Sequence, residues 1–309
     1  MKKILLASTA LVATAGIAAA EVSLSGSAEM GVVGGENIET QFHHDMDVSF
    51  NLSGESDNGI AFGAKIDLDE LDCADDPGDI ESNQGCHTVF ISAGGVTLTM
   101  GDTDGAFDEA MWGVDVGGSL ADDHTVHAGF NGNAGLDGTY DGQIARFDYA
   151  FSGFTGSFSA ELDDSGNDDA VLGLGVAYDM DLAGLTLGVG LGYQEVEDNS
   201  IVGLSVDTTF NNGLTAVVNY SQADVDGVDA DPTHMAVGFG YTMDALTIGV
   251  NYGEYDDWVL RSNPDSSGFG VAVNYDLGGG LEAQFGYGSS DVDGADTTDT
   301  YSLGLAMSF

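Results

Sequence analysis

The last twelve residues, TDTYSLGLAMSF (residues 298–309), alternate between large apolar side chains and small or polar ones. The apolar set consists of Tyr301, Leu303, Leu305, Met307 and Phe309. A period of two is typical of a β-strand whose two faces meet different surroundings. The chain therefore ends in a predicted strand, and its last residue is an aromatic on the apolar face.

The same alternation recurs throughout the chain, for example in residues 185–193, 235–243 and 269–277. In each case the set between the apolar residues is mostly Gly, Ala, Ser, Thr and Asp. Such small and polar residues suit the wall of a water-filled lumen, and the apolar set then faces lipid. Beyond the N-terminus, no stretch approaches the roughly 20 consecutive apolar residues that a membrane-spanning helix needs. If the chain crosses a membrane, it must do so as a closed β-barrel.

Alternating stretches bounded by turn residues predict sixteen strands. They are residues 22–34, 41–53, 59–70, 86–95, 96–103, 140–152, 154–163, 170–180, 184–196, 200–211, 213–224, 233–243, 245–254, 268–277, 280–290 and 298–309. An even number places both ends of the chain on the same side of the membrane, and sixteen strands enclose an aqueous channel. The predicted fold is all-β, a 16-stranded antiparallel transmembrane β-barrel.

The connections between these strands alternate in length. Short ones carry Gly and Asn, the residues of tight turns. Longer, acidic ones cover residues 71–85, 104–139, 225–232, 255–267 and 291–297. Short turns on one side and long loops on the other are typical of outer-membrane barrels.

The first twenty residues predict an export signal. Two lysines precede an apolar run from Ile4 to Ile17, and three alanines follow at 18–20. This is the pattern of a cleavable signal peptide. We therefore expect a signal peptide over residues 1–20 and a barrel domain over residues 21–309.

Cys73 and Cys86 are the two cysteines of the chain. An exported protein enters an oxidising compartment, where two thiols close in sequence usually form a disulfide. We expect these two cysteines to be bonded to each other.

The charge of the chain is strongly one-sided. It has 52 acidic residues and 5 basic ones, for a formal net charge of −47. Nucleic acid is repelled by such a surface and is excluded as a partner. Two interpretations remain open and are compatible: an acidic surface adapted to high salt, and a pore that attracts cations.

Several short segments, in order along the chain, resemble the alphaproteobacterial general porins. They are residues 21–32, 57–64, 88–92, 99–102, 146–154 and 275–280, together with the terminal Phe309. The resemblance implies a homotrimer in the outer-membrane lipid and a passive, water-filled diffusion channel for small hydrophilic solutes and ions. It also implies that the family's third loop, which is long, folds inward and narrows the pore, and that the protein is not an enzyme.

On the loop side of the pore, the candidate residues are those that the resemblance implies. Residues 103–139 form the longest connection and correspond to the inward-folded constriction loop. Asp108, Glu109 and Asp115 lie where the family's loop carries acids.

Strand alternation supplies the candidates on the opposite wall, since Asp45, Asp47, Lys65 and Arg146 all fall on lumen-facing positions. The family carries arginines on the second strand, and this chain does not. With Arg261 as the one further basic residue of the barrel domain, we expect a cation-selective pore.

Other chemistry has little support. Adjacent strand residues point to opposite faces, so His43 and His44 cannot share a metal site. His124 and His127 would need further ligands, and we expect no metal site there. Loose calcium binding by the Gly- and Asp-rich loops stays open, although they lack the ligand spacing of a calcium loop. An outer-membrane enzyme barrel and a secreted adhesin are the alternative functions.

Overall fold

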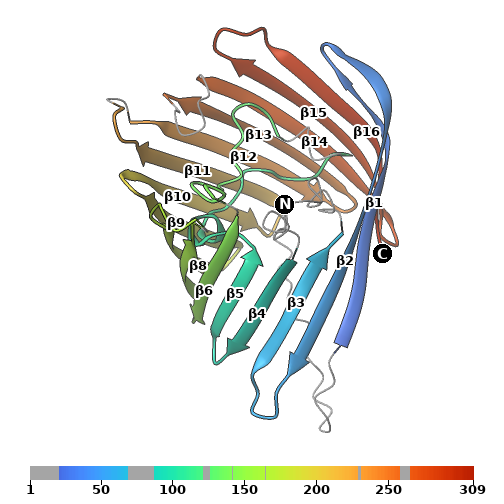
Figure 1. Cartoon of the computed structure of the whole chain (residues 1–309). Coiled ribbons are helices and arrows are strands. Elements are labelled where there is room, and N and C mark those ends of the chain that lie inside the picture. The colour runs from blue at the N-terminus through green and yellow to red at the C-terminus, as the bar shows by residue number, and fades with distance from the viewer. Residues whose placement is uncertain are drawn as a thin grey trace.

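The computed structural model describes residues 21–68, 87–120, 126–140, 142–163, 165–228, 231–257 and 265–309. These residues form a closed barrel with a short helix inside it (Figure 1). The elements are β1 (Glu21–Gly35), β2 (Ile38–Glu55), β3 (Ala61–Asp67), β4 (His87–Ala93), β5 (Val96–Asp102), α1 (Ala106–Ala110), β6 (Gln143–Phe151), β7 (Phe154–Glu161), β8 (Val171–Leu182), β9 (Leu185–Val196), β10 (Asn199–Phe210), β11 (Leu214–Asp224), β12 (Thr233–Met243), β13 (Leu246–Asp256), β14 (Ser266–Gly278), β15 (Leu281–Val292) and β16 (Thr298–Ser308).

Every strand pairs antiparallel with its neighbours in sequence, and β1 pairs with β16 to close the barrel. The terminal aromatic takes part in this closure, since the N–H of Phe309 donates to the carbonyl of Gly26 at 2.9 Å. A closed barrel leaves no unpaired strand edge, which is what a lipid environment requires. In the described part of the chain, no helix is long and apolar enough to cross a membrane.

The two faces of the barrel are the reverse of those of a soluble protein. Large apolar side chains such as Phe158, Leu174 and Leu191 are exposed on the outside. Polar side chains such as Ser205 and His234 are buried on the inside. An exposed apolar band around a polar interior is typical of a barrel embedded in lipid.

The sixteen predicted strands and their antiparallel order are confirmed. The structure differs at the first hairpin, where β2 begins at Ile38 and only Glu36 and Asn37 separate it from β1. Asn37 adopts a left-handed backbone (φ 61°), which allows so tight a turn. Helix α1 was not predicted from the sequence, because a five-residue helix has too few turns to show a helical period.

Candidate functional site

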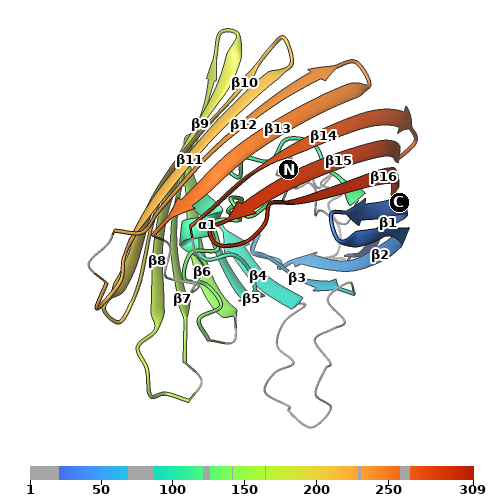
Figure 2. The same ribbon diagram turned by 90° about the horizontal axis from the view of Figure 1, so that it is seen from above.

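The described residues of the connection between β5 and β6 (residues 103–142, the constriction loop) fold into the barrel, as predicted for residues 103–139. Viewed from above, α1 lies within the ring of strands (Figure 2). It packs against β7, β8 and β9. The buried side chain of Phe107 belongs to an apolar cluster that includes Met111, Leu136 and Ile201. The loop is therefore attached to the wall by its own small apolar core.

Lumen-facing polar side chains hold the backbone of the loop at intervals along the wall. The N–H of Ala106 donates to Ser159 Oγ at 2.8 Å, and the N–H of Trp112 donates to Ser205 Oγ at 2.9 Å. Further along, Asn274 on β14 takes one hydrogen bond from Gly118 and gives one back. These contacts satisfy loop backbone groups that are buried away from water.

Glycines on the wall make room for the loop. A Cβ atom at Gly175 would overlap the carbonyl oxygen of Ala106, and one at Gly249 would overlap that of Val116. At Gly192 and Gly203 it would strike the ring of Phe107. Glycine allows this close backbone approach because it has no side chain. We call the lumen faces of β7 to β15, on which the loop lies, the covered wall.

Two acids, one buried and one partly buried, hold the base of the loop. Glu161 on β7 is 1% exposed, and its carboxylate accepts the N–H groups of Gly138, Tyr140 and Gly142. Asp137 accepts the N–H of Gly105 at 2.9 Å and a hydrogen bond from the Gln194 amide. Hydrogen bonds from several N–H groups are what stabilise a carboxylate away from water.

Burial raises the pKa of the Asp137 carboxyl from its ordinary value of 3.8 to about 6, and the neighbouring charges of Glu161 and Asp104 act in the same direction. The hydrogen bonds from Gly105 and Gln194 oppose this shift. The base of the loop therefore titrates in a range where an ordinary aspartate would be fully ionised.

Arg146 joins the loop to the wall. Its guanidinium lies 3.2 Å from the carboxylate of Glu109 on α1 and 3.0 Å from that of Asp148 on β6. It also donates to the carbonyl of Asp104 at 2.6 Å. The side chain is only 11% exposed, so the structure brings this predicted cation and the loop acid Glu109 together as a local ion pair.

The opposite side of the lumen is uncovered. None of the lumen-facing side chains of β2 to β5 is buried by the described residues, and we call this surface the open wall. Lys65 lies there, 48% exposed, with its ammonium 2.9 Å from Asp67. Its inward direction follows from the exposed, outward-facing Phe62 and Ile66 on the same strand.

The predicted acids of the open wall also face the lumen. Asp47 on β2 accepts a hydrogen bond from Ser27 at 2.6 Å, and Asp45 lies opposite Glu29 in the β1–β2 ladder. Glu29 in turn lies 3.1 Å from the His43 ring. Across the lumen, Asp108 and Asp115 of the loop are partly exposed.

Glu29, Asp67, Asp137, Asp148 and Glu161 were missed as site residues by the sequence analysis. Glu29 and Asp67 share the strand parity of the acids that were chosen, so the alternation could have identified them. Asp137 and Glu161 gave no such signal, because their role depends on where the loop returns to the wall.

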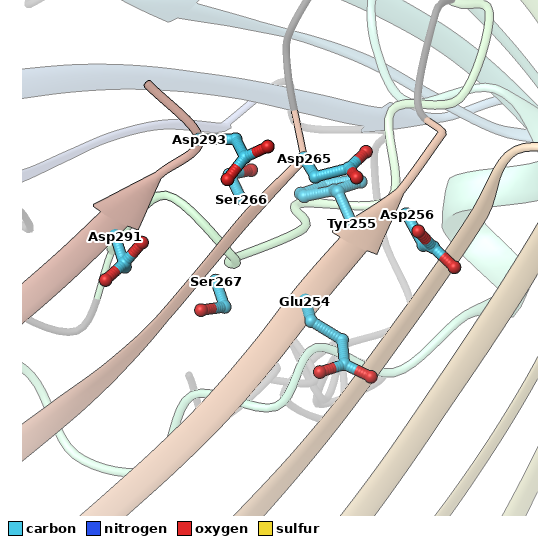
Figure 3. A pocket seen from close by; sticks show the side chains of 8 residues that line it. All are labelled: Glu254, Tyr255, Asp256, Asp265, Ser266, Ser267, Asp291 and Asp293. Atoms are coloured by element: carbon cyan, nitrogen blue, oxygen red, sulfur yellow. The ribbon is translucent and has the colours of Figure 1, made fainter. Parts of the chain in front are cut away.

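Cys73, Cys86 and Arg261 lie outside the described residues. The acidic outer loops are represented by Asp256, Asp257 and Asp265, whose carboxylate oxygens lie within 4.8 Å of one another. Two of them border a hollow of about 370 Å³ that Asp291 and Asp293 also line (Figure 3).

Comparisons with known proteins point in one direction. Residues 7–295 match the family described as Gram-negative porin. A protein named porin from Rhodobacter capsulatus is 27% identical over 310 residues, covering 89% of this chain and 96% of its own length.

Solved structures share the fold. A porin structure refined at 1.8 Å superposes with a TM-score of 0.71 at 23% identity, over 94% of this chain and all of that one. A triple mutant of the Rhodopseudomonas blastica porin gives a TM-score of 0.65 at 20% identity over the same shares.

Proposed function

This chain belongs to the Gram-negative porin family, and we propose that within the family it is a cation-preferring channel for small hydrophilic solutes and ions. Its β-barrel lies in the outer membrane, and the protein is a channel, not an enzyme. A channel of this kind performs no covalent chemistry. Its selectivity depends on the width of the lumen and on the electric field across it.

The pairing of the lumen cations carries the proposal. Arg146 is almost enclosed between Glu109 and Asp148, so its charge is neutralised where it lies. Lys65 is paired with Asp67. Acids lie on both sides of the lumen: Asp45 and Asp47 on the open wall, Glu29 beside them on β1, and Asp108 and Asp115 on the loop.

An excess of acids within a lumen concentrates cations and repels anions, because the low-dielectric barrel wall focuses the field along the channel. The charge of the whole chain acts in the same direction, with 52 acidic residues against 5 basic ones. Adaptation to high salt is the alternative interpretation of this acidic excess, so the charges that bear on selectivity are those inside the lumen.

The test is the zero-current potential of the full-length protein in a planar bilayer with a tenfold KCl gradient. We expect the sign of potassium selectivity, and a potential of the opposite sign would contradict the proposal. Liposome swelling with neutral sugars tests the open channel separately, because swelling reports solute entry regardless of charge.

We also predict four further features of the protein. These are a signal peptide over residues 1–20, a disulfide between Cys73 and Cys86, assembly as a homotrimer, and loose calcium binding by the acidic outer loops. Mass spectrometry of the exported protein, before and after reduction, tests the first two. Native mass spectrometry in detergent tests the third, and calorimetric titration with calcium chloride tests the fourth.

A further inference from the structure

We propose that His127 and His234 form an acid-sensitive latch that positions the constriction loop against the covered wall. The inference rests on the proposed channel function and adds a mode of regulation to it. The latch acts on residues 126–133, the part of the loop that runs back along the wall and that we call the returning arm.

The returning arm lies directly on the backbone of the wall. A Cβ atom at Gly253 on β13 would overlap the carbonyl oxygen of Gly129, and one at Gly268 on β14 would strike the ring of His127. Neighbouring side chains add hydrogen bonds: Ser290 Oγ accepts the N–H of Ala128. Because the arm lies this close to the wall, its contacts depend on whether the rings of His127 and His234 are neutral or protonated.

His127 is held in one neutral form by its partners. Its Nδ1 accepts the N–H of Gly129 at 3.2 Å, so the ring proton must lie on Nε2. The Nε2–H then donates to Asn251 Oδ1 on β13, also at 3.2 Å.

His234 on β12 is held in the same neutral form. Its Nε2–H donates to the carbonyl of Gly129 at 3.0 Å, and its Nδ1 accepts from the side-chain amide of Asn131 at 3.3 Å. The amide of Asn131 cannot turn over freely, because its Oδ1 accepts the N–H of Asn133 at 2.8 Å. Both rings therefore offer Nδ1 as an acceptor to a group of the returning arm.

A second proton on either ring removes that acceptor. The new N–H would point at the N–H of Gly129 or at the amide of Asn131, and one contact of each pair would be lost. Both rings are buried, His127 at 6% exposed and His234 fully, so the added charge would also be desolvated.

The pH range follows from His127, which lies in the loop. Burial lowers the pKa of its imidazole from 6.5 to about 4, and the nearby His234 acts in the same direction. The released arm therefore binds the proton more tightly than the docked arm. Docking is fully stabilised above about pH 6.5 and weakens as the pH falls toward 4.

Few charged groups of the described residues lie around the two rings. The described arm carries no acid or base other than His127. Glu254 on β13 is the charged group that interacts with His234. Tyr255, whose ring lies 4.4 Å from that of His234, donates its hydroxyl to the carbonyl of Phe130.

The remaining acids near the arm lie at strand ends. Asp256, Asp265, Asp291 and Asp293 line the hollow that Tyr255 and Ser266 also border (Figure 3). Among the described residues, the hydrogen-bond partners of both rings are neutral amides and backbone groups. A protonated ring thus gains no direct ion pair in the docked state.

The returning arm can leave the wall in one direction only. The wall behind the arm is a continuous hydrogen-bonded sheet, so an arm that leaves the wall moves into the lumen. Acid should therefore narrow the channel. We expect the single-channel conductance to fall by about twofold or more between pH 7.5 and pH 4.5, reversibly.

The experiment is single-channel recording of the full-length protein over this range, with the double variant H127Q/H234Q. Glutamine keeps an amide donor and acceptor but does not titrate, so we expect the acid transition to disappear. The matched control is H43Q, which removes the histidine of the open wall and should keep the transition. An acid transition that persists in the double variant, or is absent from the wild type, would overturn the latch.

A second measurement needs no variant. We expect hydrogen exchange in a peptide covering residues 126–133 to accelerate as the pH falls, after correction for the intrinsic rate. A peptide covering residues 105–112, held by Ser159 and Ser205, should stay protected. Equal protection of the returning arm at both pH values would refute the latch, whereas absence of conductance at pH 7.5 would refute the channel itself.

Discussion

The covered wall and the open wall are made from strands of the same kind, but the side chains on their lumen faces differ in chemistry. On the covered wall many inward residues are glycine, serine or asparagine, and several are buried under the loop, such as Ser205 and Asn219. On the open wall they include Asp45, Asp47 and Lys65, and none is buried. The first surface fixes the position of the loop, and the second meets the solute. Structural and electrostatic roles are thus divided between the two sides of one barrel.

The largest effect should come from filling the covered wall. The substitution Gly249→Val places atoms where the carbonyl of Val116 lies, so the loop cannot remain docked there. We expect a loss of about 3 kcal/mol in the free energy of unfolding, measured by urea titration in lipid vesicles. Single-channel conductance should change with it.

The matched control is Gly156→Val, at a position where a Cβ meets nothing within 4 Å. We expect its unfolding free energy and conductance to stay close to those of the wild type. If both variants behaved alike, the covered wall would have no special role in holding the loop.

Substitution of the two lumen cations should cause smaller losses of stability, and the two losses should differ. Arg146→Gln leaves Glu109 and Asp148 without their shared partner, so we expect about 2 kcal/mol of destabilisation. Lys65→Gln removes a half-exposed ion pair and should cost less than about 1 kcal/mol. Urea titration of both variants checks this order, and a larger loss for Lys65→Gln would reverse the assignment of roles.

A still smaller change in stability should appear at the base of the loop. Its dependence on pH is opposite to that of the histidine latch. Because the pKa of Asp137 is raised to about 6, the docked base binds a proton more tightly than a released one. Its contribution is therefore favourable at low pH and is lost as the pH rises from about 4 to 6. We expect a change of about 1 to 2 kcal/mol across that range, seen as hydrogen exchange of residues 134–142.

Asp137→Asn should remove this pH dependence while leaving that of residues 126–133 in place. If the substitution had no influence on the pH dependence at residues 134–142, another group would be responsible for it.

Much of the fold could be predicted because a barrel strand is a local pattern. Alternation alone located sixteen strands and placed Lys65 and Arg146 on lumen-facing positions. It could not show that Arg146 is enclosed by Glu109 and Asp148, because that depends on the path of a forty-residue loop. Nor could it show which glycines lie beneath the loop, since Gly175 and the lipid-facing Gly156 look alike in sequence.

The helix and the base of the loop illustrate the same limit. Helix α1 is stabilised by burial of Phe107 rather than by its own propensity, and it has no side-chain cap. Glu161 and Gly138 come into contact only because the loop folds back onto β7. Contacts set by tertiary packing leave no periodic signal in a single sequence.

The central claim is that the acids of the open wall set the selectivity of the channel. Its most direct test is the zero-current potential of D45N/D47N in a KCl gradient, compared with the wild type and with D163N, which alters a partly exposed acid in the connection between β7 and β8. We expect a marked loss of potassium preference in D45N/D47N and little change in D163N. An unchanged potential in D45N/D47N, with wild-type conductance, would contradict it.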